Sequence, residues 1–439
     1  PPLRRPHSSR TAWDPVAHRL EWAVVGLHGL RLRVVADARG TDDGGPDFRA
    51  SELPRQSEPD RHPVGHRTGP LASQPMSSPA ARVANRVTGR LRTFRRQVGG
   101  SSTPVGVNRG KGRLRLSGRA TQCLQWLPPR VFRIVAQRAR TVDVAGLEVA
   151  GSKGVAQLAA AGACLVGDAP ANDGSSLAEL VRDADVATPL DRARHSVRLR
   201  RAARRWSEVP SISVVMATKR PWALPAAMEQ MSGQVDVDVE ISLGLHGAAW
   251  DDWSDERIRD LTPWPVRVTR VPEAASLGTV LNEATSNATS SIVTKWDDDD
   301  WYGRGHLADV VDALDYAGAT LVGKAAEFVY LESSDVLIRR DADRSERFST
   351  RLAGGTFTIS RDDLRRVGGW PDVRRHVDLA LLESIRRAGG TTYRTHGFDY
   401  ILMRRPSEGA DHTWAADDAY FLSIASDRWT GLRTDLASA

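Results

Sequence analysis

The sequence predicts an α/β protein whose residues 207–439 form a mostly parallel, doubly wound sheet flanked by helices. Three observations lead to this expectation. Continuous apolar runs alternate with helical patterns from residue 210 onward, which is typical of parallel sheets covered on both faces. A smaller α/β pattern occupies residues 147–206, and residues 1–146 form a low-complexity region rich in Arg, Pro and Gly. We therefore expect a large C-terminal domain, a small α/β fragment and a poorly ordered N-terminal region.

The N-terminal region shows neither helical nor strand periodicity over a useful length. Its low hydrophobicity and high charge favour loose structure. Residues 22–27 are an isolated apolar run that is compatible with a buried strand.

The pattern changes near residue 147. We expect a helix over residues 154–161, a short buried strand over 163–166, and a second helix over 175–181 with Ser175 as its cap. Residues 192–206 follow with seven arginines and one histidine, which indicates a basic amphipathic helix. Such a helix either faces solvent or contacts an anionic surface.

A clearer alternation begins at Pro210. Strands are expected where apolar residues run continuously, and helices where they recur every three or four residues. The expected strands are residues 212–216, 237–245, 266–271, 292–296 and 400–404. The expected helices are residues 222–231 and 276–288, the latter with Ser276 as its cap. In such sheets, ligands bind beyond the carboxyl ends of the strands.

The composition is that of a globular protein with an unusual source of basicity. Apolar residues make up 41% and charged residues 26% of the chain, and the net charge is +7. Only five of the 61 basic residues are lysines. Such an excess of arginine also arises from genome base composition, so the charge indicates no specific nucleic-acid partner. It fits a contact with anionic lipid or an anionic substrate equally well.

Cysteines and apolar runs bear on the cellular compartment. Cys123 and Cys164 form no metal-ligand or disulfide pattern. The sequence has no run of about 18 apolar residues, and its first residues lack the basic-then-apolar layout of a signal peptide. We expect a cytoplasmic protein, and a peripheral contact with the inner face of the membrane stays open.

The acidic run Asp297-Asp298-Asp299-Asp300 follows the expected strand 292–296. Because side chains alternate in an extended segment, Asp297 and Asp299 are expected to share one face. Holding these carboxylates together at a partly buried strand end is costly without a cation. Oxygen ligands alone suit Mg²⁺ or Mn²⁺, which could bridge a diphosphate and neutralise a phosphate leaving group. A solvated acidic turn is the less favoured interpretation.

A calcium loop is the competing metal site. Counting from Asp298 places Gly303 at position six, but Tyr302 at position five and Asp309 where the terminal Glu belongs. A strand also precedes the run where an EF-hand has a helix, so we reject this interpretation.

Residues 210–305 resemble the family 2 glycosyltransferases of GT-A fold. The resemblance rests on three motifs in order: Ile-Ser-Val-Val-Met-Ala-Thr at 212–218, Leu-Asn-Glu-Ala at 281–284, and Ile-Val-Thr-Lys-Trp-Asp-Asp-Asp-Asp at 292–300. It implies a nucleotide-diphosphate sugar as donor and Mn²⁺ or Mg²⁺ as cofactor. By this match, Asp297 faces the nucleotide side of the donor and both Asp297 and Asp299 belong to the metal site.

Residues near the ends of the first two strands are candidates for binding the donor. Thr218, Lys219 and Arg220 end the first strand, where cations could meet phosphates. The family's second strand ends in an acidic turn, whereas this strand ends in His246-Gly247, so we expect His246 to contact the nucleotide. Exposed basic and histidine-containing loops remain the alternative for these positions.

Later motifs supply further candidates. Gly354, Gly355 and Thr356 form a turn in which glycines allow close approach to a ligand. The resemblance implies a carboxylate base near a helix start, and Asp378 is our candidate for this catalytic residue. The resemblance further implies a late histidine as a metal ligand.

His412 is best placed for that ligand, with His396 as the alternate candidate and Trp414 closing over the donor or acceptor. Arg404 and Arg405 are further candidates for phosphate contacts. For each of these positions, a tight turn, a helix cap or a structural side chain is the alternative.

The leading hypothesis is a metal-dependent, inverting transfer of a hexosyl-type sugar to a hydroxyl of a cell-envelope glycan, a lipid-linked glycan or a small molecule. A sugar-nucleotide pyrophosphorylase would need a glycine-rich loop after the first strand, and residues 219–221 lack those glycines. The alternative from another class is a basic protein that binds nucleic acid or a membrane surface and carries a degenerate transferase domain. Such a domain has no need to retain Asp297, Asp299, Asp378 and His412 together.

Overall fold

The structure is a computed structural model that describes residues 22–23, 33–34, 113–115, 135–136, 139, 141–145, 147–149, 151–168, 174–204, 206, 208–373, 375–405 and 418–439. The chain divides into two units, Pro1–Gly106 and Val107–Ala439. In the first unit, β1 (Trp22–Ala23) lies inside the apolar run 22–27 that was expected to form a strand, and it pairs antiparallel with β2 (Arg33–Val34).

The second unit begins with a small α/β module. Its three-stranded parallel sheet has the order β3 (Arg113–Arg115), β4 (Thr141–Asp143), β5 (Leu165–Val166). The helices α4 (Lys153–Ala160), α5 (Ser176–Arg182) and α6 (Pro189–Ala203) accompany it. Two of these strands, β3 and β4, precede residue 147, where we expected the module to start. The sequence did not reveal them, because strands of three residues are too short to show a periodicity.

Serine and threonine caps start the three helices of this module. The hydroxyls of Ser152 and Ser175 accept hydrogen bonds from backbone N–H groups of α4 and α5. At α6, Thr188 and Asp191 form a capping box, and Pro189 occupies the first helical position. The expected cap at Ser175 is therefore confirmed.

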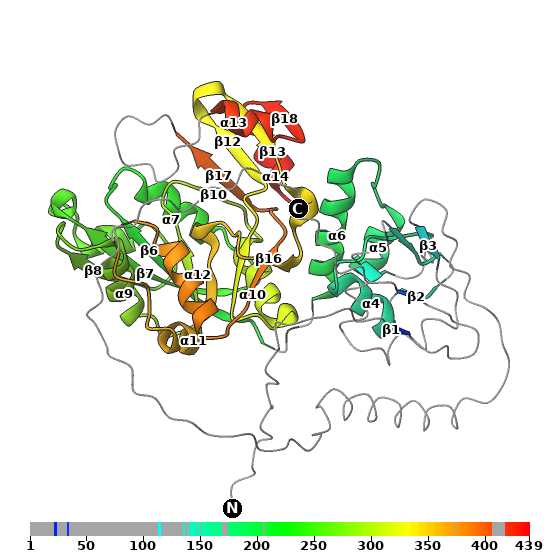
Figure 1. Ribbon diagram of the computed structural model, residues 1–439, viewed down its shortest axis with the longest axis horizontal. Helices are drawn as coiled ribbons and strands as arrows, with labels where there is room; N and C mark the ends of the chain where they lie inside the picture. The colour runs from blue at the N-terminus through cyan, green and yellow to red at the C-terminus, as the bar shows by residue number, and fades with distance from the viewer. Residues whose placement is uncertain are drawn as a thin grey trace, which may run out of the picture. The chain divides into compact units, whose positions relative to one another are not determined.

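The main sheet has eight strands in the order β14-β16-β11-β15-β9-β6-β7-β8. Figure 1 labels β6, β7, β8 and β16 of this sheet. The expected strands appear as β6 (Ser211–Thr218), β7 (Asp238–His246), β8 (Val266–Val271) and β9 (Ile292–Trp296). These four are parallel to their neighbours within the set. The others are β11 (Leu321–Lys324), β14 (Arg347–Phe348), β15 (Thr358–Ser360) and β16 (Thr392–Thr395).

The sheet is more mixed than the sequence predicted. Strand β15 runs antiparallel to both β9 and β11, and β14 runs antiparallel to β16. Apolar runs mark a buried strand but do not encode its direction, so the sequence pattern could not separate these strands from parallel ones.

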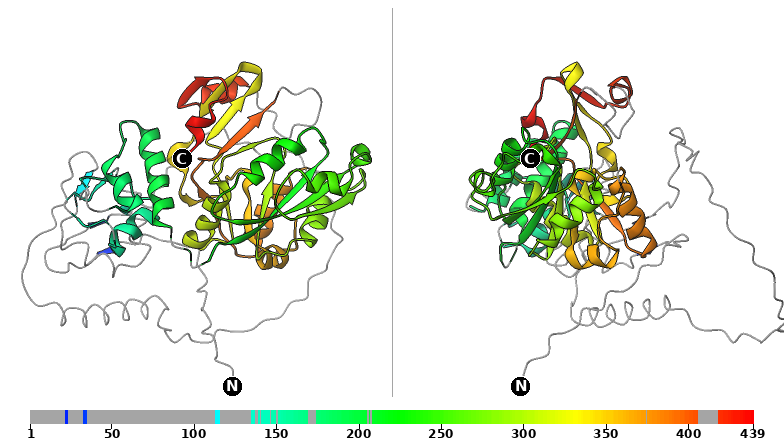
Figure 2. Two further views of the ribbon diagram at one scale, coloured as in Figure 1. Left: turned by 180° about the vertical axis from the view of Figure 1, so that it is seen from behind. Right: turned by 90° about the vertical axis from the view of Figure 1, so that its left-hand side faces the viewer.

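Helices cover both faces of the main sheet (Figure 2). On one face, Val214 and Met216 of β6 share a buried cluster with α7 (Leu224–Ser232), α8 (Asp255–Arg259) and the start of α10 (His306–Ala317). On the other face, Val215 packs with α9 (Leu277–Ser286), α11 (Arg361–Arg366) and α12 (Val377–Arg387). Successive side chains of β6 point to opposite faces of the sheet, and both faces are apolar. The core therefore has two layers, one on each side of the sheet.

A second sheet of five strands was not predicted, apart from one member. Its order is β10 (Trp301–Tyr302), β17 (Tyr400–Arg404), β12 (Phe328–Leu331), β13 (Val336–Arg339), β18 (Asp427–Thr430). The short helices α13 (Asp418–Ser423) and α14 (Thr434–Ala437) lie with it near the C-terminus (Figure 1). Strand β10 directly follows the acidic run, so this sheet bears on the site described below.

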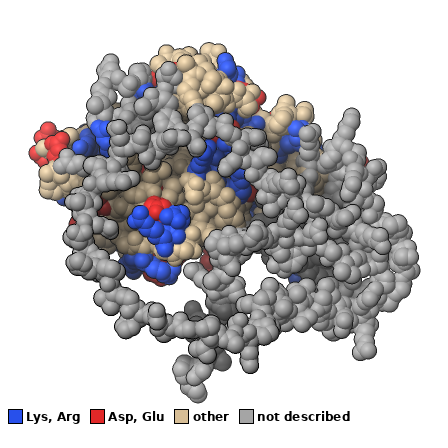
Figure 3. Space-filling model, viewed as in Figure 1, with Lys and Arg blue, Asp and Glu red and all other residues tan. Residues whose placement is uncertain are grey.

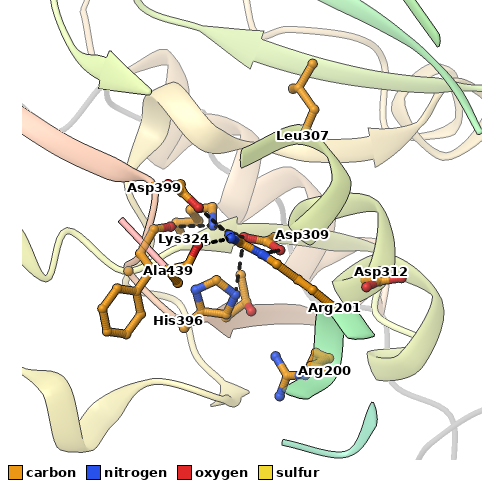
Figure 4. A network of polar contacts seen from close by, with 12 residues as sticks. Arg200, Arg201, Leu307, Asp309, Asp312, Lys324, His396, Asp399 and Ala439 are labelled. Carbon is orange, nitrogen blue, oxygen red and sulfur yellow. Dashed lines mark hydrogen bonds and ion pairs between the residues drawn. The ribbon is translucent and has the colours of Figure 1, made fainter. Parts of the chain in front are cut away.

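Two arginines of α6 have buried or partly buried carboxylate partners within the chain. Arg200 Nη1 lies 2.8 Å from Glu346 Oε1, and Arg201 Nη2 lies 2.7 Å from Asp309 Oδ2. Figure 4 shows Arg201 pointing into a cluster of polar side chains from α10, β11 and the segment between β16 and β17. The basic helix expected to face solvent or an external anionic surface therefore packs against residues of the same unit.

No helix of the described residues is long and apolar enough to cross a bilayer. The Lys and Arg side chains visible in Figure 3 lie in several patches, separated by tan and grey surface.

Candidate active site

Four segments distant in sequence converge at the carboxyl end of β9. The acidic run follows β9 directly, and the loop after β6 lies beside it because β6 and β9 pair in parallel with Met216 opposite Trp296. The turn at 354–356 and the first turn of α12 complete the group, through Gly355 and Asp378. This is the edge at which parallel α/β sheets bind ligands.

Asp298 and Asp300 are buried and fix the acidic run to its surroundings. Asp298 Oδ2 accepts a hydrogen bond from Arg220 Nε at 3.1 Å. Asp300 accepts hydrogen bonds from the Tyr400 hydroxyl at 2.6 Å and the Met403 backbone N–H at 2.9 Å. Burial raises the pKa of both carboxyls. These two residues therefore anchor the run to the loop after β6 and to β17.

Asp297 and Asp299 are the two accessible carboxylates of the run. Their side chains are 34% and 24% exposed, whereas those of Asp298 and Asp300 are buried. Asp297 Oδ1 lies 2.7 Å from Lys295 Nζ, and Asp299 Oδ2 accepts a hydrogen bond from Arg220 Nη1 at 2.7 Å. The chain turns at residues 298–300, where we expected an extended segment, but the alternation in exposure holds.

The surroundings of Asp297 raise its pKa. Although its side chain is 34% exposed, the loss of water around the carboxyl group raises the pKa to about 6; Lys295 opposes the rise, and the carboxylates of Asp378 and Asp299 add to it. The negative charge around the run thus favours a further cation.

Lys295 is a site residue to which the sequence analysis gave no role. It is buried in β9, and its ammonium group lies 2.7 Å from Asp297 Oδ1 and 3.3 Å from Asp378 Oδ1. It therefore joins the acidic run to the base candidate. A signal was present, since a lysine inside an otherwise apolar strand is seldom buried without an acidic partner.

Asp378 lies in the first turn of α12, as expected. Its side chain is 35% exposed, and its Oδ1 atom has an ion pair with Lys295 but no hydrogen-bond donor among the described residues. The positive end of the α12 backbone dipole lies beside the carboxylate as well. Asp378 thus presents a carboxylate that reaches solvent at the same place as Asp297.

The Gly354-Gly355 turn allows these carboxylates to come close. A Cβ atom at Gly354 would overlap Asp378 Oδ2, and one at Gly355 would lie 2.7 Å from Asp297 Oδ2. The glycines therefore make room for side chains of the site. Thr356 is buried, and its hydroxyl bonds to Ala353 O at 2.7 Å and accepts from the Lys324 N–H at 2.8 Å, so it holds the turn.

The loops after β6 and β7 hold the remaining candidates for donor binding. The Thr218 hydroxyl donates to Asp298, and Lys219 is exposed next to it. His246 is buried at the end of β7, with Nε2 3.2 Å from the carbonyl oxygen of Glu273. Burial lowers the pKa of His246, and Lys219 lowers it further. Their roles in donor binding stay predictions.

The late candidates have different outcomes. His412 and Trp414 lie outside the described residues. His396 is buried away from the acidic run, with Nε2 3.5 Å from Asp309 Oδ2. Arg404 Nε lies 3.7 Å from Asp418, and the guanidinium of Arg405 lies 4.8 Å from the centre of the Trp222 ring.

The donor set fits Mg²⁺ or Mn²⁺ in part. Mg²⁺ is commonly held by one or two carboxylates together with substrate phosphates and water, and Asp297 and Asp299 supply two accessible carboxylates. Among the described residues, no group of three or more His, Cys, Asp or Glu side chains could hold a metal ion. The carboxylate oxygens of Asp297 and Asp299 nevertheless have the ligand chemistry that suits a divalent cation.

No family model matches the sequence, and no curated protein matches it. The mannosyltransferase PcManGT from Pyrobaculum calidifontis, in complex with GDP-Man and Mn²⁺, is 17% identical over 46% of this chain, with a TM-score of 0.36. TarS 1–349 of S. aureus, in complex with UDP-GlcNAc, is 11% identical over 45% of this chain, with a TM-score of 0.37.

The matched region covers 59% of the first structure and 60% of the second, which is less than two thirds of each.

Proposed function

We propose that this chain is a metal-dependent glycosyltransferase that moves a sugar from a nucleotide-diphosphate donor to a hydroxyl acceptor with inversion. One observation supports the proposal most strongly. Asp297 and Asp299 are accessible at the carboxyl end of β9, and Asp378 lies beside them because Lys295 forms ion pairs with both Asp297 and Asp378. A degenerate domain would have no need for carboxylates converging from segments about eighty residues apart in sequence.

The donor's diphosphate would be held by carboxylates and cations together. Asp297 and Asp299 would hold Mn²⁺ or Mg²⁺, which, when bound, neutralises charge on the leaving diphosphate. Arg220 already contacts Asp298 and Asp299, and its planar guanidinium suits phosphate oxygens. Lys219 is exposed in the same loop and adds positive charge there.

Asp378 would act as the general base. The acceptor oxygen forms a bond to the anomeric carbon as the bond from that carbon to the diphosphate breaks, and Asp378 takes the hydroxyl proton. Lys295 and the Gly354 backbone hold this carboxylate beside Asp297 and so keep the base next to the donor site. Displacement in line inverts the configuration at the anomeric carbon.

An experiment on Asp378 tests these assignments. With Mn²⁺ and UDP-glucose or GDP-mannose, the Asp378→Asn variant should release nucleotide about 10²- to 10⁴-fold more slowly than the wild type. Its binding of the nucleotide should be unchanged. Asp362→Asn is a matched control, because Asp362 also lies in the first turn of a helix but is 85% exposed on α11. Equal rates for wild type and Asp378→Asn would overturn the assignment of the base.

A further inference from the structure

Two neighbouring arginines of α6 contact different parts of the large domain (Figure 4). Arg200 is buried against Glu346, at 2.8 Å, and against the Tyr316 hydroxyl, at 3.1 Å. Arg201 reaches Asp309 of α10 with two hydrogen bonds, at 3.0 and 2.7 Å, and forms an ion pair with Asp399. Both arginines dock α6, but only Arg201 reaches the residues that adjoin the acidic run.

The Arg201–Asp399 pair packs directly on the segment that follows the acidic run and β10. A Cβ atom at Gly303 would overlap Asp399 Oδ1, and one at Gly305 would overlap the Arg201 guanidinium. The Gly303 N–H also donates to the backbone oxygen of Asp399 at 3.1 Å. This glycine-containing segment is therefore shaped to receive the ion pair, and its position depends on where the pair lies.

The same ion pair fixes the start of β17, which in turn holds Asp300. Asp399 has a φ of 59°, in the left-handed region, and its N–H donates to Ala437 O at 2.7 Å. The next residue, Tyr400, donates its hydroxyl to Asp300 Oδ2 at 2.6 Å and pairs with Tyr302 of β10. Contacts thus run without a break from α6 to a buried carboxylate of the acidic run.

We propose that Arg201 is a positioning residue for the acidic run, and that α6 is a structural part of the site although it precedes residue 207. Arg201 holds Asp399, and Asp399 holds both Gly303 and the β17 strand to which Asp300 is bound. The expected consequence for donor binding rests on the function proposed above, whereas the effect on the order of the acidic run does not.

Helix α6 also connects the small α/β module with the site. The same helix contacts that module through His195, whose Nε2 lies 2.8 Å from Leu165 O of β5. Arg200 Nε donates to Ala160 O of α4 at 3.2 Å. A single rigid helix of 15 residues therefore bonds to the module on one side and to the frame of the acidic run on the other.

The test compares Arg201→Met with Arg200→Met in the full chain. Arg200→Met is a matched control, because it removes a buried arginine of the same helix that is also bound to a carboxylate. We expect hydrogen exchange of the backbone amides of residues 297–305 to rise about tenfold or more in Arg201→Met and to stay at the wild-type rate in Arg200→Met. Calorimetry with Mn²⁺ and UDP or GDP should show weaker binding only for Arg201→Met.

Equal exchange over residues 297–305 in both variants would overturn the proposal, because α6 would then act only as a general stabiliser. If Arg201→Met does not fold, Asp399→Asn replaces it, since asparagine tolerates the left-handed backbone but removes the ion pair. If the wild type binds neither nucleotide, the proposed function fails, and the exchange comparison still decides the role of Arg201.

Discussion

Glu346 offers a test of how strongly α6 is bound to the large domain. Its carboxylate accepts hydrogen bonds from Arg200 at 2.8 Å and from the Tyr316 and Tyr393 hydroxyls, each at 3.0 Å. Burial alone would raise the pKa of Glu346, but the charge of Arg200 and these hydrogen bonds lower it from 4.5 to about 2. Because one pKa unit corresponds to about 1.36 kcal/mol, the ionised carboxylate contributes up to about 3 kcal/mol to the free energy of unfolding.

We predict that Glu346→Gln lowers the free energy of unfolding by about 3 kcal/mol at pH 7. The sign follows from the lowered pKa: the contribution is fully present above about pH 4.5 and is lost as the pH falls toward about 2. Urea unfolding at pH 7 and pH 3 should therefore show a difference between wild type and variant that shrinks to about half at pH 3.

The control for this experiment is Glu383→Gln on α12. Arg386 and Arg387 lower the pKa of Glu383 to about 2 as well, but the pair lies at the surface, so its removal should change stability little. Equal unfolding free energies for wild type and Glu346→Gln at pH 7 would refute the reasoning, as would a difference between them that stays constant down to pH 3.

Three further predictions concern the site. Because the pKa of Asp297 is raised to about 6, the affinity for Mn²⁺ in the presence of nucleotide should fall below pH 6, by roughly tenfold per pH unit, in calorimetric titrations. Tyr400→Phe removes the hydrogen bond to the buried Asp300 and should lower the free energy of unfolding by about 1–3 kcal/mol in urea titrations. Gly354→Ala places a methyl group on Asp378 and should slow donor turnover while nucleotide affinity stays within a few-fold of wild type. Unchanged turnover in that variant would show that Asp378 can move without loss.

The elements around the acidic run could be predicted because their signals are local. Buried runs at β6, β7 and β9 stand out as continuous apolar segments, and the Ser276 hydroxyl accepts the expected hydrogen bond from the Thr279 N–H at the start of α9. The expected alternation in exposure between Asp297 and Asp298 is present, although the run turns after β9 and is not extended.

The features that were missed depend on partners far away in sequence. Arg201 and Asp399 are separated by 198 residues, so nothing near α6 shows that its arginines are paired within the chain. Apart from β17, the second sheet consists of strands of two to four residues, which are too short for a periodicity. The role of Lys295 could not be predicted, because its partner Asp378 is distant in sequence and comes near it only in the folded chain.

The most direct test of the central claim is calorimetric binding of UDP and GDP, each with Mn²⁺ and with EDTA, to the wild type and to Asp299→Ala. The proposed function predicts that one nucleotide binds the wild type with Mn²⁺, and that this binding is lost with EDTA and in Asp299→Ala. Asp362→Ala, which changes an aspartate that is 85% exposed on α11, should bind like the wild type. Absence of binding by folded wild-type protein under every condition, or binding that needs neither Mn²⁺ nor Asp299, would contradict the claim.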